Sequence, residues 1–160
     1  MARRWGDLPL ATLIHENFAV IMRYAFSQPS LVRWVEKHFR TAKYLHKSVF
    51  GVAEQRVNIA LLEFATQLRL LDDHEPLPDL YKDLRFGKFL RHDGTEEKLN
   101  FRQMTNKIVH SQEIEWDFTN EDDPIIICRP QPADEKRWDW VKAEIRVIDL
   151  ANYCRSLMSY

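Results

Sequence analysis

The spacing of apolar residues over the first seventy positions predicts a series of amphipathic helices. From about Leu10 to Phe26, apolar side chains recur at helical intervals rather than in alternation. Gln28-Pro29-Ser30 interrupts this pattern, because proline disfavours a helical conformation in the residue before it. A second helix is expected from about 31 to 50, and Gly51 separates it from a third over Val52 to about Leu71. The third helix has the strongest apolar stripe and is expected to be the centre of the core.

The middle of the chain is more polar and is expected to contain connections and one short helix. Residues 72–78, Asp-Asp-His-Glu-Pro-Leu-Pro, are typical of a solvated connection. A shorter helix, interrupted near Gly87, is expected at about 80–90. His92-Asp93-Gly94 then predicts a turn.

After residue 112 the apolar period changes from that of a helix to that of strands. Three segments rich in Ile, Val, Trp and Phe predict strands at 113–118, 124–128 and 140–147. Residues 120–123, Asn-Glu-Asp-Asp, form a turn between the first two. Asp149 is a suitable N-cap for a final helix.

The predicted fold class is therefore α+β, mainly α: a helical bundle followed by a small antiparallel β-meander and a C-terminal helix. One domain is expected over 1–160, with the helical part at about 8–111, the meander at about 113–148 and the last helix at about 149–159. The hydrophobic fraction of 45% and charged fraction of 29% are those of a globular protein.

Charge and composition exclude several classes of protein. The net charge of -1 gives no global attraction to nucleic acid or membranes, so any such partner must be recruited by a local patch. No apolar run is long enough to span a membrane, and the first residues lack the apolar core of a secretory signal. Cys128 and Cys154 are far apart, which favours a reduced, cytoplasmic chain, although one disulfide is the alternative. Four scattered glycines form no phosphate-binding loop, so no cofactor is expected.

The most informative segment is a predicted helix from about Phe101 to Ser111. Asn100, with Gln103 three residues later, resembles a capping box that would begin this helix. Polar residues four apart climb one side of it, and apolar residues lie roughly opposite, facing the core. The polar stripe is Arg102, Asn106 and His110, and the apolar face is Phe101, Met104 and Ile108.

The stripe has residue types suited to one kind of chemistry. His110 can exchange a proton near neutral pH, and Arg102 can hold a phosphate and stabilise charge that develops on it. Asn106 can orient either group. With no acidic metal cluster nearby, this set suits metal-independent RNA cleavage. The alternative is an ordinary surface helix whose outer face is polar.

Residues 106–110, Asn-Lys-Ile-Val-His, resemble the signature helix of the HEPN superfamily (higher eukaryote and prokaryote nucleotide-binding domains). This resemblance implies a small helical bundle that dimerises with its two motifs facing each other. Active HEPN proteins are metal-independent ribonucleases of toxin–antitoxin, abortive-infection and other defence systems. Other members have lost catalysis and serve as binding or assembly modules.

The resemblance assigns roles to individual residues. His110 matches the motif histidine and becomes the general acid/base, and Asn106 matches the polar residue. At the commonest spacing the arginine position holds Thr105, so Arg102, with seven residues between it and the histidine, is the candidate phosphate-stabilising cation. Lys107 is a candidate auxiliary and nucleic-acid contact. The helices before the motif fit the resemblance, and the β-meander after it does not belong to the general HEPN bundle.

A basic strip on the second predicted helix is the other candidate for contact with nucleic acid. It consists of Arg33, Lys37, Arg40, Lys43 and Lys47. Such a strip can follow a nucleic-acid backbone, or it can simply keep the helix soluble. No aromatic residues are expected among these cations as a stacking platform. His38 and His46 are expected to be structural and at least partly buried.

We therefore expect a HEPN-like metal-independent endoribonuclease of a bacterial defence or toxin-type system. The alternative is a catalytically silent HEPN-like module that binds a nucleotide, a nucleic acid or a protein, and a third option is a structural protein. The expected partners are a second copy of the chain, RNA or a nucleotide, and a cognate antitoxin or defence protein, without a membrane.

Overall fold

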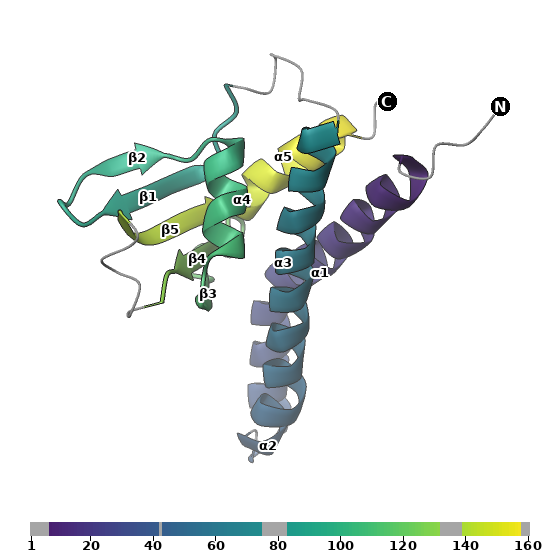
Figure 1. Cartoon of the computed structure of the whole chain (residues 1–160). Helices are drawn as coiled ribbons and strands as arrows, with labels where there is room; N and C mark the ends of the chain where they lie inside the picture. The colour runs from purple at the N-terminus through teal and green to yellow at the C-terminus, as the bar shows by residue number, and fades with distance from the viewer. Residues whose placement is uncertain (1–6, 42, 75–82, 132–138, 158–160) are drawn as a thin grey trace.

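The computed structural model of the chain describes residues 7–41, 43–74, 83–131 and 139–157. Two long helices cross and form an arm, and a twisted sheet with two shorter helices lies against one side of it (Figure 1). The fold is α+β and mainly helical, as the sequence predicts. The helices are α1 (Asp7–His38), α2 (Lys43–Leu45), the π-helical turn η1 (His46–Phe50), α3 (Gly51–His74), α4 (Phe101–Val109) and α5 (Val147–Leu157). The strands are β1 (Gly87–Arg91), β2 (Glu96–Lys98), β3 (Glu113–Asp117), β4 (Ile125–Arg129) and β5 (Trp140–Arg146).

The first helix continues through Pro29, so the predicted break at residues 28–30 is wrong. Proline inside a helix removes one backbone hydrogen bond and costs about 3 kcal/mol. Packing on both sides of the proline offsets this cost, since Ile21 and Ala25 before it and Val35 after it are all buried. Burial along a 32-residue helix outweighs the local preference of one residue.

The break between the two long helices lies further along the chain, after His38. Residues 36–41 are all exposed, so no packing favours a longer α1. The turn η1 runs directly into α3, and Gly51 has helical backbone angles of φ −62° and ψ −39°. One helix over 31–50, ended by Gly51, is therefore wrong, whereas the third predicted helix is confirmed as α3.

The sheet has strand order β2-β1-β5-β4-β3, and each neighbouring pair is antiparallel. β3, β4 and β5 are the predicted meander. The β1–β2 hairpin adds to the other edge of β5, which the meander alone would leave with unpaired backbone groups. The helix predicted at 80–90 is wrong: residues 80–82 lie outside the described residues, and 87–90 form a strand in which Lys88 is exposed and Phe89 is buried. The turn at 92–94 is confirmed as the hairpin turn, where Gly94 has φ +84°.

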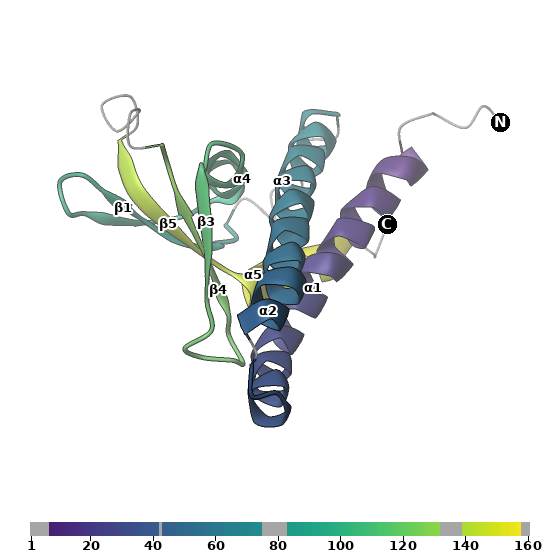
Figure 2. The ribbon, with the colours of Figure 1, turned by 90° about the horizontal axis from the view of Figure 1, so that it is seen from below.

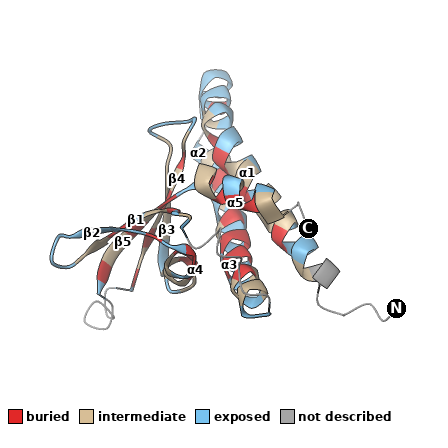
Figure 3. Cartoon of the chain, turned by 90° about the horizontal axis from the view of Figure 1, so that it is seen from above, coloured by how far each residue is buried: buried red, intermediate tan, exposed pale blue. Residues whose placement is uncertain are grey.

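In the segments that the structure describes, helices cover one face of this sheet and leave the other open. α4 lies between the sheet and α3, and buried residues gather where these elements and α5 meet, whereas the end of the arm near α2 is mostly exposed (Figures 2 and 3). Trp116 of β3 reaches α3, since its indole nitrogen donates to the Asn58 side chain at 3.1 Å. Trp140 is buried, so both of these tryptophans cover the helices as predicted, and Trp138 lies outside the described residues.

The last helix begins two residues before the predicted N-cap. β5 ends at Arg146, and the Val147 amide that opens α5 donates to the carbonyl of Pro124 at 3.2 Å. Asp149 therefore lies inside the first turn, not at the N-cap. There its carboxylate still lies near the positive end of the helix dipole.

Gly87 is expected to be the least replaceable glycine of the three in the described part of the chain. It has φ +122°, and a Cβ there would overlap the carbonyl oxygen of Glu144 in the neighbouring strand. Gly87→Ala should lower the free energy of unfolding by more than about 2 kcal/mol. Urea unfolding would measure this loss.

Two other glycines provide matched controls. In Gly94→Ala the new side chain must adopt a positive φ but meets no neighbouring atom. The unfavourable φ alone should cost about 1–2 kcal/mol. Gly51→Ala lies in helical, open surroundings and should stabilise by about 0.5–1 kcal/mol. Equal losses for Gly87→Ala and Gly94→Ala would contradict the proposed clash between β1 and β5.

Candidate functional site

The helix that carries the predicted polar stripe forms as expected. The Asn100 side chain accepts a hydrogen bond from the Gln103 amide at 2.8 Å, and the Gln103 side chain accepts one from the Asn100 amide at 3.0 Å. This capping box satisfies amides that a helix start leaves free. The helix ends at Val109, two residues earlier than predicted, and His110 is its C-cap, donating its amide to the carbonyl of Asn106.

The rotation of α4 agrees with the sequence pattern. Phe101, Met104 and Ile108 are buried, and Arg102 and His110 are exposed. Asn106 is partly exposed on the same side. Val109, which lies beside the stripe, is partly buried and packs against the core of its own chain.

The guanidinium of Arg102 is held by two carboxylates of α3. Its Nε lies 2.6 Å from Oδ2 of Asp72, and its terminal nitrogen lies 2.5 Å from Oδ1 of Asp73. The hydrogen bond between Arg102 and Asp73 raises the pKa of the arginine and lowers that of the aspartate. A phosphate at Arg102 would therefore compete with these acids. Both aspartates belong to α3 rather than to the predicted loop, whose residues 75–78 lie outside the described part.

Thr105, at the commonest arginine position of the resembled motif, is fully buried. Its hydroxyl donates to the carbonyl of Arg102 at 3.2 Å. This position therefore contributes no side chain to the exposed face that carries His110.

Lys107 points toward the sheet and away from the stripe. Its side chain is only 12% exposed, and its ammonium lies 4.3 Å from the ring centre of Trp140 and 4.7 Å from that of Phe89. Burial lowers the pKa of Lys107 to about 8, although the carboxylate of Asp139, 3.9 Å away, opposes this effect. The ring faces partly replace water around the cation. As placed, Lys107 offers little surface to a nucleic acid.

The five cations of the predicted basic strip surround the turn between the long helices, instead of lying along one helix. Arg33 is a bidentate partner of Glu121 in the β3–β4 loop, and this bond raises the arginine's pKa and lowers the glutamate's. Arg33 thus fastens the arm to the sheet. The other four are exposed and make no ion pair within the described ranges: Lys37, Arg40, Lys43 and Lys47.

Exposed aromatic side chains lie among these four cations, so the prediction that no aromatic residues accompany them is wrong. We call residues 34–49 the arm tip. Trp34 is 53% exposed, Phe39 44% and Tyr44 80%. The Trp34 ring stacks on His38 at 4.7 Å, and its centre lies 5.8 Å from that of Phe39.

The two histidines of the arm tip differ in their exposure. His38 is exposed against Trp34, so the prediction that it is at least partly buried is wrong. His46 is partly buried and lies 4.8 Å from the ring of Phe50, as a structural residue would.

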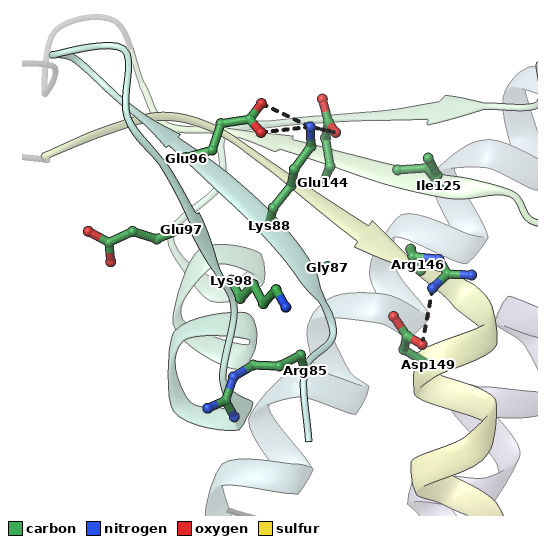
Figure 4. Close-up of a pocket in the computed structure, with 10 residues that line it drawn as sticks. All are labelled: Arg85, Gly87, Lys88, Glu96, Glu97, Lys98, Ile125, Glu144, Arg146 and Asp149. Atoms are coloured by element: carbon green, nitrogen blue, oxygen red, sulfur yellow. Dashed lines mark hydrogen bonds and ion pairs between the residues drawn. The ribbon is translucent and has the colours of Figure 1, made fainter. Parts of the chain in front are cut away.

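The outer face of the sheet has an open pocket of about 570 Å³ (Figure 4). Four cations and four acids line it, and several of them pair with one another. Lys88 bonds Glu96 at 2.9 Å and lies 3.7 Å from Glu144, and Arg146 pairs with Asp149 at 3.7 Å. A lining with no excess charge does not favour a phosphate.

Among the residues that the structure describes, no three His, Cys, Asp or Glu side chains are grouped to hold a metal ion. Both cysteines are buried free thiols. None of the helices in the described segments combines the length and apolar character needed to cross a membrane. Comparison with protein-family models, curated proteins and solved structures finds no match to this chain.

The lowered pKa of Lys107 predicts a distinct pH dependence of stability. The unfolded chain returns this amine to its ordinary pKa of about 10.4. Between pH 8 and that value the unfolded state binds more protons here, so the free energy of unfolding rises with pH relative to a variant without the amine. Urea unfolding at pH 7, 8.5 and 10 would measure the free energy of unfolding of wild type and of Lys107→Met. The value for wild type minus that for the variant should rise with pH.

The matched control is Lys98→Met, which removes an exposed lysine from β2. The difference in free energy of unfolding between wild type and Lys98→Met should not rise with pH in this way. If the difference in free energy of unfolding between wild type and Lys107→Met stays constant from pH 7 to 10, the claim that burial lowers the pKa of Lys107 is contradicted.

Proposed function

We propose that this chain is a HEPN-like module that binds single-stranded RNA through the arm tip and is catalytically silent at α4. The observation that carries this proposal is that one end of the arm combines exposed aromatic rings with cations that make no ion pair in the described part of the chain. A cytoplasmic setting suits the proposal, because the chain has two buried free thiols.

The charge of the arm tip supports an anionic partner. Residues 34–49 contain four Lys or Arg and one Glu, a net charge of +3 in a chain whose total is −1. The positive charge is therefore local, and the rest of the molecule is acidic. Contacts between such cations and phosphates release counterions, so binding should weaken as salt is added.

The aromatic rings favour single strands over duplexes. A base can stack on an exposed ring only when it is not already paired and stacked, and each such contact contributes about 1–3 kcal/mol. Trp34, Phe39 and Tyr44 come from α1, the turn after it and α2, so they surround one end of the arm. Trp34 and Phe39 lie in ring contact with each other although both are largely exposed, which a surface needed only for solubility would not require.

The setting of Arg102 supports catalytic silence. Two aspartates already neutralise the cation that the resemblance would assign to the phosphate, and Thr105 is buried. Cleavage would require the phosphate to displace these acids.

Metal-independent endoribonuclease activity remains the second candidate. The observation in its favour is that His110 is exposed at the end of α4, one turn after Asn106, on the predicted side of the helix. A bacterial defence or toxin-type role, with a cognate antitoxin or defence partner, belongs to this second proposal.

The binding experiment measures fluorescence anisotropy of a labelled single-stranded RNA with wild type and variants at several salt concentrations. Trp34→Ala should weaken binding by about 5- to 100-fold, from the loss of one stacking contact. Lys43→Gln with Lys47→Gln should lower the slope of log affinity against log salt by about 1.4, at about 0.7 for each lost phosphate contact.

Two controls remove similar groups outside the arm tip. Phe26→Ala removes another exposed aromatic residue of α1, and Lys98→Gln removes an exposed cation of the sheet. Neither should change affinity more than about 2-fold, well below the stacking loss. If the controls and the tip variants weaken binding equally, or if wild type does not bind, the arm tip is not an RNA site.

Cleavage separates the two candidate functions. Wild type and His110→Ala are incubated with a mixed RNA pool in EDTA. Intact RNA with both proteins is the result expected for a silent module. Cleavage that survives EDTA and is lost in His110→Ala would overturn catalytic silence and establish the second candidate.

A further inference from the structure

The pair between Arg33 and Glu121 lies at the border of the arm tip. Arg33 directly precedes Trp34, and the loop that carries Glu121 joins β3 to β4 beside the end of α1 that leads to the arm tip (Figure 2). One guanidinium nitrogen of Arg33 donates to Oε2 of Glu121 at 3.0 Å and to the hydroxyl of Ser30 at 3.1 Å. A basic side chain next to the proposed RNA surface is thus already bound to an acid.

The position of Arg33 on α1 extends the row of cations at the arm tip. Lys37 lies one turn further along the same helix, about 40° around the axis and about 6 Å along it. The two side chains therefore share one face of α1, and Trp34 lies beside that face. An RNA strand that contacts Lys37 and stacks on Trp34 would meet Arg33 next, one turn closer to the sheet.

Glu121 opposes a contact between Arg33 and a phosphate. Its carboxylate binds both terminal nitrogens of the guanidinium, and these are the groups with which an arginine holds a phosphate. Its negative charge would also repel a phosphate at the same place. The hydrogen bond from Arg33 lowers the pKa of Glu121, so the acid keeps this charge at neutral pH.

The β3–β4 loop holds Glu121 in place by contacts of its own. The Asn120 side chain accepts a hydrogen bond from the amide of Asp122 at 3.2 Å, and the Asn120 carbonyl accepts one from the amide of Asp123 at 3.1 Å. The carboxylate of Asp123 binds Arg146 of β5 at 2.8 Å. Because the loop is anchored to the sheet, the carboxylate of Glu121 stays beside α1 at a high effective concentration, and a phosphate must displace it.

From these contacts we infer that Glu121 is an autoinhibitory acid, which withholds Arg33 from RNA and limits the RNA site to the arm tip. This inference rests on the proposed function of the arm tip. When the acid is removed, Arg33 becomes an additional phosphate contact. One such contact changes the slope of log affinity against log salt by about 0.7, which corresponds to about 5-fold in affinity at about 0.1 M salt.

The same anisotropy titration with single-stranded RNA tests the autoinhibition. Glu121→Gln should raise the affinity about 5-fold at about 0.1 M salt and steepen the salt slope by about 0.7. The matched control is Asp122→Asn, which removes the same charge from the same loop. Asp122 is exposed and makes no ion pair among the described residues, so its loss releases no arginine. The control should raise the affinity less than about 2-fold and leave the salt slope unchanged.

A double variant assigns the gain in affinity to Arg33. Arg33→Gln/Glu121→Gln has the same net charge as wild type, but it lacks the arginine that Glu121→Gln releases. Its affinity should fall back to within about 2-fold of the wild-type value. A gain that persists in the double variant would show that loss of the acid alone strengthens binding, and the inference would be wrong.

The titrations also separate failure of this inference from failure of the proposed function. If wild type does not bind RNA, or if Trp34→Ala binds as well as wild type, both are wrong. If wild type binds through Trp34 but Glu121→Gln binds no more tightly, or Asp122→Asn gains as much, only the autoinhibition is contradicted. Circular dichroism checks that each variant is folded, which is expected because the Arg33–Glu121 pair is exposed and contributes little to stability.

Discussion

The rotational setting of α4 is the constraint on which the rest of the candidate site depends. The sheet has one apolar face, and α4 must cover it while also packing on α3. Met104 and Ile108 meet this requirement, and the capping box at Asn100 sets where the helix begins. Once these are in place, the direction of every other side chain of α4 follows from the helical repeat.

This rotation of α4 directs some of its polar residues outward and one of them toward the sheet. Arg102 and His110 face outward, but Arg102 comes within reach of the acidic end of α3. Lys107 faces the sheet, where the rings of Phe89 and Trp140 surround its ammonium. The same packing that presents the predicted stripe thus neutralises its cation and removes its auxiliary lysine from the surface. Four exposed cations that make no ion pair within the described residues lie instead at the arm tip.

The sequence predicts those features that depend on neighbours close along the chain. α3, α4, the β3–β5 meander and the hairpin turn are all read from local periodicity, capping or turn residues. Pro29 is misread because its local cost is outweighed by burial against α3 on both sides. The segment at 87–90 is misread because β1 pairs on one side with β5, about fifty residues later, besides its hairpin partner β2.

In the candidate site, too, features set by neighbours along the chain can be predicted and contacts between distant residues cannot. The outward direction of Arg102 and His110 can be predicted from spacing alone. The bond from Arg102 to Asp73 cannot, since the two residues are 29 positions apart and lie on different helices. Trp34, Phe39 and Tyr44 lie on α1, in the turn after it and on α2 because α1 ends at His38. Local periodicity does not predict this end, since it continues one helix to residue 50.

The central claim is that the arm tip, and not α4, is the surface that meets RNA. The most direct measurement is a titration of isotope-labelled protein with single-stranded RNA, followed by the NMR signals of the tryptophan indoles and backbone amides. The account predicts that the Trp34 indole and the amides of the arm tip shift first, whereas Trp116, Trp140 and α4 stay unchanged. Shifts at Asn106 and His110 with a constant Trp34 signal would contradict it, and would move the RNA site to the helix that the HEPN resemblance first indicated.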